Sequence, residues 1–306
     1  MSSRIGNYTR TDSDFVSRGT RCAGWLYIPD GVAAPPAVIM AHGFGAERTF
    51  RLPAYAARLA EAGYAVFLFD YRCFGASDGR PRQLVSPSRH VQDWLAAIDH
   101  VRALREVDGE RIALWGTSFS GGHVIAAAAK GAPVRAIVAQ VPYVDPFSTF
   151  SRLGLTHILR SLIAALRDAV RLLTSRPPYY VPIVGEPGTL ACMNTPDSKP
   201  GYLALVPPDS SWKNECPARI LFTVSFYRPL GLSARVKCPA LLMAAEKDSL
   251  ISLEAVERTA ARIQGAVIVR LPVGHFDVYW GGAFEDTIRI GSDFLKAQMR
   301  AGMIMV

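Results

Sequence analysis

Short, continuously apolar runs alternate along the chain with longer amphipathic stretches. The apolar runs, five or six residues each, are Gly24–Ile28, Ala37–Ala41, Ala65–Asp70, Arg111–Trp115, Ala136–Val141, Ala240–Ala244 and Val267–Leu271. The amphipathic stretches carry apolar residues near helical spacing and are Pro53–Gly63, Ser86–Glu106, Phe119–Lys130, Leu253–Ile263 and Phe284–Met299. Continuous apolarity is typical of strands that are buried on both faces. The pattern therefore predicts an α/β fold, with a mostly parallel central sheet and helices on both of its faces.

The alternation stops after Val141 and resumes near Pro239, which indicates an insertion. Within it, His157–Thr174 has the pattern of an amphipathic helix with a broad apolar face, and the chain that follows is rich in proline and irregular. We therefore divide the chain into an α/β core of residues 20–145 and 236–306, an inserted cap of residues 146–235, and an N-terminal arm of residues 1–19.

Composition and charge narrow the class of protein. The chain has 306 residues, of which 50% are hydrophobic and 20% charged, as expected of a globular protein with ample apolar surface to bury. The formal net charge is +8, and residues 146–235 hold ten Lys or Arg against five Asp or Glu, which accounts for +5 of it. Because the sequence has no lysine-rich run and no interleaved aromatic and basic residues, we expect no nucleic-acid partner.

Targeting and metal signals are weak. The first ten residues contain no apolar segment of the kind that secretion requires, so we expect a cytoplasmic protein. The longest uncharged run, Ile112–Ala129, is broken by glycine and serine and reads as strand, turn and helix, so no stable membrane insertion is expected. The five cysteines are widely spaced and the six histidines form no cluster with carboxylates. These spacings predict reduced thiols and no metal site.

The segment around Ser118 carries the strongest chemical signal. It runs Gly116-Thr-Ser118-Phe-Ser120-Gly-Gly, between a predicted buried strand and a predicted alanine-rich helix. A nucleophilic serine needs this context, because a sharp turn from strand to helix exposes its hydroxyl and small residues two positions away let the backbones cross. Ser120 stands where glycine is usual, and serine is small enough to fit there. We therefore predict that Ser118 is a nucleophile.

Two further candidate groups follow predicted strands. Asp248 comes after Ala240–Ala244 and His275 after Val267–Leu271, which gives the chain order serine, acid, histidine. In a triad of this kind the histidine accepts the serine proton, and the carboxylate fixes the histidine tautomer and stabilises the imidazolium. Glu246 and Asp145 also lie at strand ends and remain alternatives for the acid.

The strand Ala37–Ala41 leads into His42-Gly-Phe44-Gly. A backbone N–H in such a loop points into the site, so the Phe44 and Phe119 amides are predicted to form an oxyanion hole. His42 is assigned a structural role. The loop from Asp70 to Gly79 is also expected to be structural, fixed by its glycines and by local Asp and Ser hydrogen bonds.

Taken together, these segments resemble α/β-hydrolase-fold serine hydrolases, in particular the branch related to dienelactone hydrolases and X-prolyl peptidases, which includes esterases and acyltransferases. The matching segments lie in the predicted core, and residues 146–235 match no motif. Cys73 and Ser120 depart from the family pattern, since both stand at usual glycine positions. The resemblance implies the α/β-hydrolase fold and serine-based acyl chemistry, and neither departure removes a catalytic group.

We therefore expect a carboxylesterase that forms an acyl-Ser118 intermediate, with His275 as base and Asp248 as acid and with no cofactor. The expected partner is a small-molecule ester with a small to medium, apolar acyl group, and Leu162 and Leu166 of the cap are predicted to line its pocket. An acyltransferase or thioesterase, then a peptidase, remain alternatives, and a non-catalytic binding protein on this fold is an alternative from another class. The sequence leaves the oligomeric state open, a homo-oligomer included.

Overall fold

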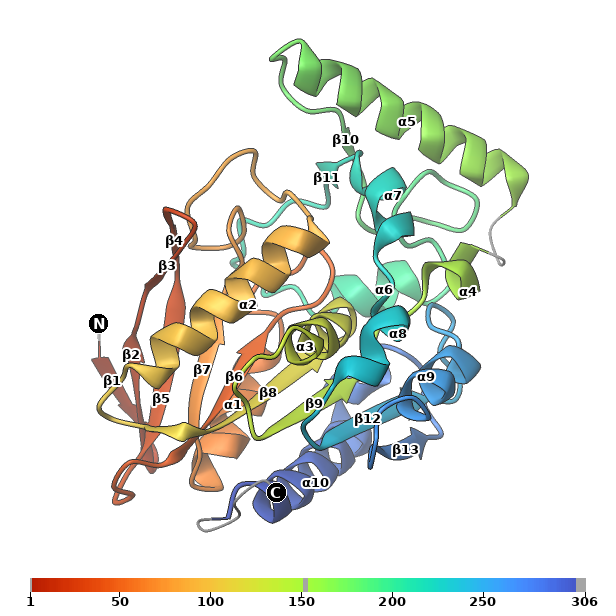
Figure 1. Cartoon of the computed structure of the whole chain (residues 1–306). Helices are drawn as coiled ribbons and strands as arrows, with labels where there is room; N and C mark the ends of the chain where they lie inside the picture. Colours follow the sequence, from red (N-terminus) through yellow and green to blue (C-terminus); the bar gives the residue numbers. More distant parts are fainter. Residues whose placement is uncertain (1, 151–153, 301–306) are drawn as a thin grey trace.

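The computed structural model describes residues 2–150 and 154–300. Residues 151–153 of the predicted cap and 301–306 of the predicted core lie outside this range. Within the described residues, a nine-stranded sheet has the order β1-β2-β5-β7-β6-β8-β9-β12-β13 (Figure 1). Its strands are β1 Ser2–Ile5, β2 Tyr8–Asp12, β5 Gly24–Pro29, β6 Pro36–Ala41, β7 Ala65–Phe69, β8 Asp108–Thr117, β9 Ala136–Gln140, β12 Ala240–Ala245 and β13 Val267–Leu271.

The sheet is parallel over most of its width. Strands β7, β6, β8, β9, β12 and β13 run parallel to one another, and β5, β2 and β1 add an antiparallel edge that begins where β5 pairs with β7. The mostly parallel sheet predicted from the apolar runs is confirmed. The short strands β3 Phe15–Ser17 and β4 Thr20–Cys22 form a separate hairpin.

Helices cover both faces of the sheet, as predicted. Helices α2 Pro87–Arg102 and α3 Phe119–Ala129 pack on one face, and α1 Leu52–Glu61 and α10 Gly281–Gln298 pack on the other (Figure 1). Helix α9 Leu253–Ala260 packs against β12 and β13. No described helix combines the length and the apolarity needed to cross a membrane.

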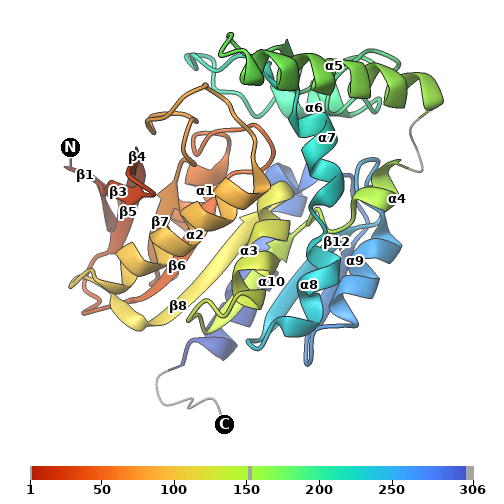
Figure 2. The ribbon, with the colours of Figure 1, turned by 45° about the horizontal axis from the view of Figure 1, so that its top comes forward.

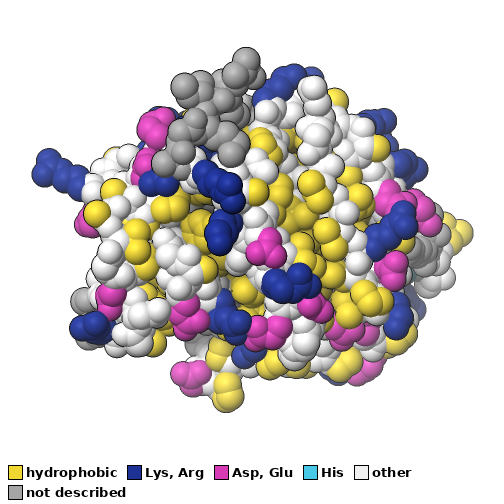
Figure 3. Space-filling model, turned by 90° about the horizontal axis from the view of Figure 1, so that it is seen from below, with side chains coloured by type: hydrophobic (Ala, Val, Ile, Leu, Met, Phe, Trp, Pro, Cys, Tyr) yellow, Lys and Arg dark blue, Asp and Glu magenta, His cyan; other side chains and the backbone are white. Residues whose placement is uncertain are grey.

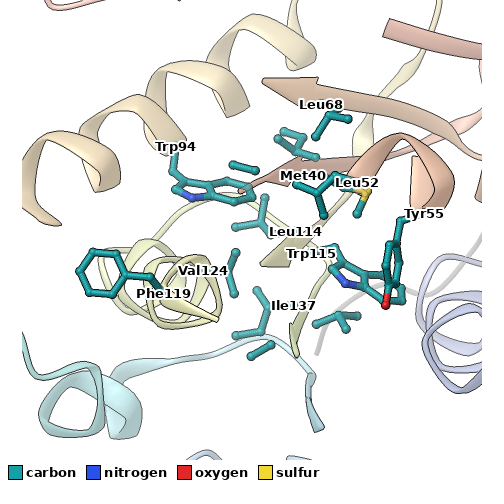
Figure 4. Close-up of a cluster of buried hydrophobic side chains, with 14 of the residues drawn as sticks. Met40, Leu52, Tyr55, Leu68, Trp94, Leu114, Trp115, Phe119, Val124 and Ile137 are labelled. Carbon is teal, nitrogen blue, oxygen red and sulfur yellow. The ribbon is translucent and has the colours of Figure 1, made fainter. Parts of the chain in front are cut away.

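Figure 4 shows part of the core on either side of the sheet. Trp94 of α2 and Val124 of α3 lie on one side, whereas Trp115 of β8 lies beside Tyr55 of α1 on the other, with ring centroids 5.8 Å apart. Both tryptophans are almost fully buried, so each anchors one layer of helices to the sheet.

The N-terminal residues are more regular than the sequence pattern suggests. Within the predicted N-terminal arm, β1 and β2 pair with each other, and β2 pairs with β5 at the sheet edge. The half-buried and exposed positions of β2 carry polar residues, so this edge lacks the continuous apolarity by which the central strands are recognised.

Between β9 and β12 the chain forms mostly short elements. They are α4 Pro146–Phe150, α5 Leu155–Leu173, β10 Tyr180–Val181, α6 Ser198–Leu203, β11 Cys216–Pro217, α7 Ile220–Thr223 and α8 Pro229–Leu232, with 3₁₀ turns at Val224–Phe226 and Ser233–Arg235. A further 3₁₀ turn, Asp277–Tyr279, follows β13. Figure 2 shows α5, α6 and α7 together on one side of the sheet, and α5 packs against α7.

Charge is distributed unevenly over the surface. On the face opposite α5, Lys and Arg side chains are interspersed with Asp and Glu (Figure 3). Helix α5, by contrast, carries Arg160, Arg167 and Arg171, and its one acidic residue, Asp168, is fully buried. The solvent side of α5 is therefore basic and apolar.

Candidate active site

Ser118 lies on a sharp turn between β8 and α3. Its backbone has φ 55° and ψ −120°, in the left-handed half of φ space that non-glycine residues rarely adopt. Gly116 makes the turn feasible, because a Cβ added to it would clash with the Ser120 carbonyl oxygen. The strand–turn–helix context predicted from the sequence is therefore present.

Ser120 occupies the position that is usually glycine, and the structure gives a reason for it. The Ser120 side chain is buried, and its Oγ lies 2.8 Å from the hydroxyl oxygen of Tyr71. That tyrosine oxygen also accepts a hydrogen bond of 2.9 Å from the Trp94 indole. The extra hydroxyl of Ser120 is thus satisfied in the core and ties the first turn of α3 to the chain after β7.

The structure brings Ser118, His275 and Asp248 together. His275 Nε2 lies 3.0 Å from Ser118 Oγ, and His275 Nδ1 lies 2.6 Å from Asp248 Oδ2. The side chains of His275 and Asp248 are each 3% exposed, so this hydrogen-bond chain is shielded from water. Asp248 Oδ1 also accepts the backbone N–H groups of Leu250 and Ile251, each at 2.8 Å, which fixes the carboxylate in place.

The two alternative acids lie elsewhere. Glu246 is exposed at the end of β12. Asp145 is buried, and it accepts a hydrogen bond of 3.0 Å from Arg228 Nε while Arg258 Nη2 lies 3.6 Å from its other oxygen. Of the three carboxylates considered from the sequence, Asp248 is the one whose oxygen lies within hydrogen-bond distance of the histidine.

The loop after β6 approaches the same serine. A Cβ added to Gly43 would lie 3.1 Å from Ser118 Cβ, so the Gly43 backbone passes directly over the turn that carries Ser118. The Phe44 and Phe119 rings pack edge to face with centroids 5.2 Å apart. Phe119 is the first residue of α3, and amides in the first turn of a helix have no partner within that helix. Both predicted oxyanion-hole residues therefore border Ser118.

His42 and the loop after β7 support this arrangement. The His42 ring packs against Tyr71 and Phe74, and burial lowers the pKa of its imidazole to about 4, so it is neutral at neutral pH. Asp70 accepts the Arg48 amide at 2.7 Å and the Ala76 amide at 3.2 Å. Cys73 has φ 74°, which explains why glycine is usual at that position.

Two cavities meet at Ser118. The larger, of about 510 Å³, lies between the turn at Ser118 and the predicted insertion, residues 146–235, which we call the inserted segment. It is lined mainly by apolar side chains. The smaller, of about 30 Å³, lies beside His275. Leu162, a predicted pocket residue, lies on the wall of the larger cavity. Leu166 does not line either cavity and is 66% exposed, because it lies on the outward face of α5.

Comparison with known proteins agrees with this geometry. Residues 33–271 match the family described as serine aminopeptidase, S33, which covers more than two thirds of the chain. This chain belongs to the S33 family of α/β-hydrolases. The resemblance to α/β-hydrolase-fold serine hydrolases seen in the sequence is thereby confirmed.

Individual relatives of this S33 hydrolase span nearly its whole length. It is 38% identical to the quorum-quenching protein AidA of Acinetobacter baumannii over 93% of this chain and 94% of the relative. It is 27% identical to the polyketide transferase af380 of Aspergillus fumigatus, over 95% and 99% of the two chains. The crystal structure of the α/β hydrolase GrgF from Penicillium superposes with a TM-score of 0.79 at 25% identity, covering 95% of this chain and 99% of that one.

The inserted segment of this S33 hydrolase contributes residues that the pattern of apolar and polar positions does not identify. Tyr202 donates its hydroxyl to the Phe44 carbonyl oxygen at 2.8 Å, and Trp212 donates its indole N–H to the Gly45 carbonyl oxygen at 2.8 Å. These contacts hold the loop that carries the Phe44 amide. Tyr202 lies in the short helix α6 and Trp212 in irregular chain, so neither belongs to an element long enough for periodicity to mark it.

A buried polar chain also joins the insertion to α3. His123 Nδ1 lies 2.6 Å from the hydroxyl oxygen of Tyr227, and His123 Nε2 lies 3.2 Å from His90 Nδ1. Burial lowers the pKa of His123 to about 3 and that of His90 well below its usual value, so both rings are neutral at neutral pH. The pair serves packing between layers and does not contact Ser118 Oγ.

The arrangement supplies a serine hydroxyl that borders both cavities, a histidine base and a buried carboxylate in series, with two backbone amides nearby. Such a set can transfer a proton from serine while an oxyanion is stabilised. Across residues 2–150 and 154–300, no group of three or more His, Cys, Asp or Glu side chains is arranged to hold a metal ion.

Proposed function

We propose that the protein is a serine hydrolase that cleaves carboxylic esters through an acyl-Ser118 intermediate. The observation that carries this proposal is the hydrogen-bond chain from Ser118 Oγ through His275 to Asp248. In the proposed reaction Ser118 Oγ attacks the carbonyl carbon, His275 Nε2 accepts the serine proton, and Asp248 stabilises the imidazolium. The Phe44 and Phe119 amides receive the oxyanion.

The reaction is proposed to proceed in two halves. His275 passes the proton to the departing alkoxide, which leaves as the alcohol, and then activates a water that attacks the acyl-enzyme. Because this chain supplies nucleophile, base and acid, the proposed reaction needs no cofactor. The cavity of about 510 Å³ fits a small to medium, apolar acyl group, within the range of ordinary small-molecule sites.

Acyl transfer is the second candidate, because the similar protein from Aspergillus fumigatus is named a polyketide transferase. It would use the same acyl-Ser118 with an alcohol or amine in place of water. A peptidase is a third, in keeping with the description of the family as serine aminopeptidase. All three share the first chemical step and differ in the groups that enter the two cavities.

The first step is tested by labelling with a fluorophosphonate. We expect wild-type protein to be labelled at Ser118, as located by peptide mass mapping, and S118A to remain unlabelled. Absence of label on the folded wild-type protein would reject every serine-hydrolase assignment and favour a non-catalytic binding protein. A panel of esters, acyl thioesters and aminoacyl amides then ranks the three candidate activities.

A further inference from the structure

The two cavities at Ser118 differ greatly in size. Their volumes are about 510 Å³ and about 30 Å³, and both are bordered by Ser118, His275, Phe44 and Met193. Ser118 and His275 therefore lie between the large cavity and the small one and border both. An ester that reacts with Ser118 must place its acyl chain and its alkoxy group in different directions from the carbonyl carbon, so the two cavities receive different parts of the substrate.

The two cavities share His275 but differ in the residues around it. Phe276 and Tyr279, which follow His275 in the chain after β13, line the small cavity and not the large one. The large cavity is lined by Phe119 and by more of the inserted segment, including α5 and α7, which Figure 2 shows together above the sheet. The histidine must reach the oxygen of the leaving group and later the attacking water, so both are assigned to the side that His275 lines together with its chain neighbours.

The walls of the small cavity are fixed in place. Tyr279 is buried, and its hydroxyl lies 2.6 Å from Thr117 Oγ1, while burial raises its pKa to about 12, so it remains a neutral hydroxyl. Tyr202 is held by its hydrogen bond to the Phe44 carbonyl oxygen. Phe50 is 2% exposed and packs edge to face against the Tyr202 ring. Enlarging the space would therefore require breaking hydrogen bonds or shifting packed rings.

We infer that the small cavity is the subsite for the leaving group and for attacking water, and that it selects esters with a large acyl group and a very small alcohol. This rests on the proposed function and specifies its substrate class. A volume of about 30 Å³ is of the order of a few waters, which suits attacking water or a methoxy or ethoxy group. The large cavity takes the acyl chain.

The inference also separates hydrolysis from acyl transfer. In acylation the bond from Ser118 Oγ to the carbonyl carbon forms, the carbon–alkoxy bond breaks, and the serine proton leaves with the alcohol. In the second half a water oxygen bonds to the same carbon and one of its protons passes to His275. The bond from that carbon to Ser118 Oγ then breaks, His275 returns the proton to Ser118 Oγ, and the acid departs. A bulky alcohol acceptor does not fit the place that water occupies, so water or methanol completes the reaction.

The test uses two isomeric esters, methyl octanoate and heptyl acetate, which differ in which side of the ester bond is large. We expect kcat/KM to be higher for methyl octanoate by at least about tenfold, the low end of the discrimination that a single misfitting methylene produces. Equal values, or a preference for heptyl acetate, on protein whose Ser118 reacts with a fluorophosphonate would overturn the inference while leaving the proposed function intact. Protein that does not label would overturn both.

Two variants locate the effect. The variants are compared on methyl acetate and heptyl acetate, which share one acyl group and differ in the alcohol alone. Leu205 borders the small cavity and not the large one, so L205A should narrow the preference for methyl acetate over heptyl acetate severalfold. Leu221 borders the large cavity and not the small one, so L221A should change the preferred acyl length of methyl esters and leave the methyl-to-heptyl acetate ratio unaltered. Fluorophosphonate labelling shows that each variant is folded. A methyl-to-heptyl acetate ratio that responds to L221A and not to L205A would reverse the assignment of the two cavities.

Competition between acceptors gives an independent measurement. Methyl octanoate serves as donor, and methanol or hexanol is added to the buffer. The ratio of new ester to octanoic acid reports which acceptor reaches the acyl-enzyme. Because transfer to methanol regenerates the donor, the methanol is isotopically labelled. We expect methanol to compete with water and hexanol to give little hexyl octanoate, with more from L205A. Efficient formation of hexyl octanoate by the wild-type protein would contradict the inference and favour acyl transfer.

Discussion

The α/β core and the inserted segment bury their apolar residues to very different extents. Every residue of the core strand β7 is buried. Helix α5 has 19 residues, of which Ala164, Ala165 and Asp168 are buried, whereas Leu159, Ile163, Leu166 and Val170 are each at least half exposed. An apolar pattern thus predicts burial in a sheet covered on both faces, but not on a helix most of whose apolar residues are exposed.

A polar contact holds α5 in place where its leucines do not. Asp168 is fully buried and accepts hydrogen bonds from Arg219 Nε at 2.6 Å and from the Tyr179 and Arg219 backbone N–H groups. Burial alone would raise the pKa of Asp168, but the Arg219 and Tyr179 hydrogen bonds outweigh it and lower the pKa. The core is therefore held by apolar packing, whereas α5 of the inserted segment is held by the hydrogen bonds of Asp168. A substitution can consequently weaken one region and leave the stability of the other largely unchanged.

The largest effect is expected from the reacting groups at the edge of the core. D248N should lower kcat by roughly 10³- to 10⁴-fold, because the amide favours the wrong histidine tautomer, and H275A should be at least as damaging. Ester hydrolysis under substrate saturation measures both. D145N is the matched control, since Asp145 pairs with Arg228 away from His275. A large loss in D145N with a small one in D248N would reassign the acid.

The next effect concerns the anchor of the inserted segment. D168N should destabilise the protein by about 3 kcal/mol, since removing one partner of a buried ion pair leaves Arg219 without its counter-charge. Protection of α5 amides in hydrogen exchange should fall more than protection in β7. The control is D30N, whose pair with Arg4 is exposed and should be worth less than about 1 kcal/mol. Uniform loss of protection in both regions would contradict separate anchoring.

The free energy of unfolding should depend on pH because the core contains buried histidines whose pKa is lowered in the folded state. His42 and His123 have folded pKa values of about 4 and about 3, below the ordinary 6.5, so they stay neutral in the folded state while the unfolded chain binds protons below pH 6.5. Stability is therefore lost as pH falls below 6.5, by about 1.4 kcal/mol per pH unit for each histidine. Burial raises the pKa of Asp93, which opposes part of this loss.

Urea unfolding at pH 7.5, 6.5, 5.5 and 5.0 measures this dependence. The expected result is a free energy of unfolding that falls below pH 6.5. In H42N the slope of this free energy against pH should decrease by up to about 1.4 kcal/mol per pH unit, which corresponds to one proton. The slope can be compared between the two proteins even if the substitution lowers the free energy of unfolding at every pH. A free energy of unfolding that stays constant from pH 6.5 to pH 5.0 would show that these histidines are not neutral in the folded protein.

The two regions also differ in how far sequence predicts structure. The core strands and the residues Ser118, His275 and Asp248 follow from continuous apolar runs, because each functional residue comes directly after a strand. Tyr202 and Trp212 could not be found this way, since they act through hydrogen bonds to the Phe44 and Gly45 carbonyls from a six-residue helix and from irregular chain. The apolar face of α5 indicates a helix, but periodicity alone does not say which apolar residues face a cavity and which face water.

That ambiguity gives the smallest and most specific prediction, in which two leucines of α5 are compared. Leu162 lines the large cavity, whereas Leu166, one turn further on, is 66% exposed and lines neither cavity. L162W should shift the preferred acyl group of methyl esters toward shorter chains, by roughly 10-fold in the kcat/KM ratio, because added bulk fills space that the acyl chain needs. L166W should leave the ratio unchanged, because its ring extends into solvent.

Relative kcat/KM for methyl butanoate and methyl decanoate measures the shift, with fluorophosphonate labelling as the check that Ser118 remains reactive in both variants. If L166W alone altered chain-length preference, the outward face of α5 would have to contact substrate, and the position of α5 over the cavity would need to change during the reaction.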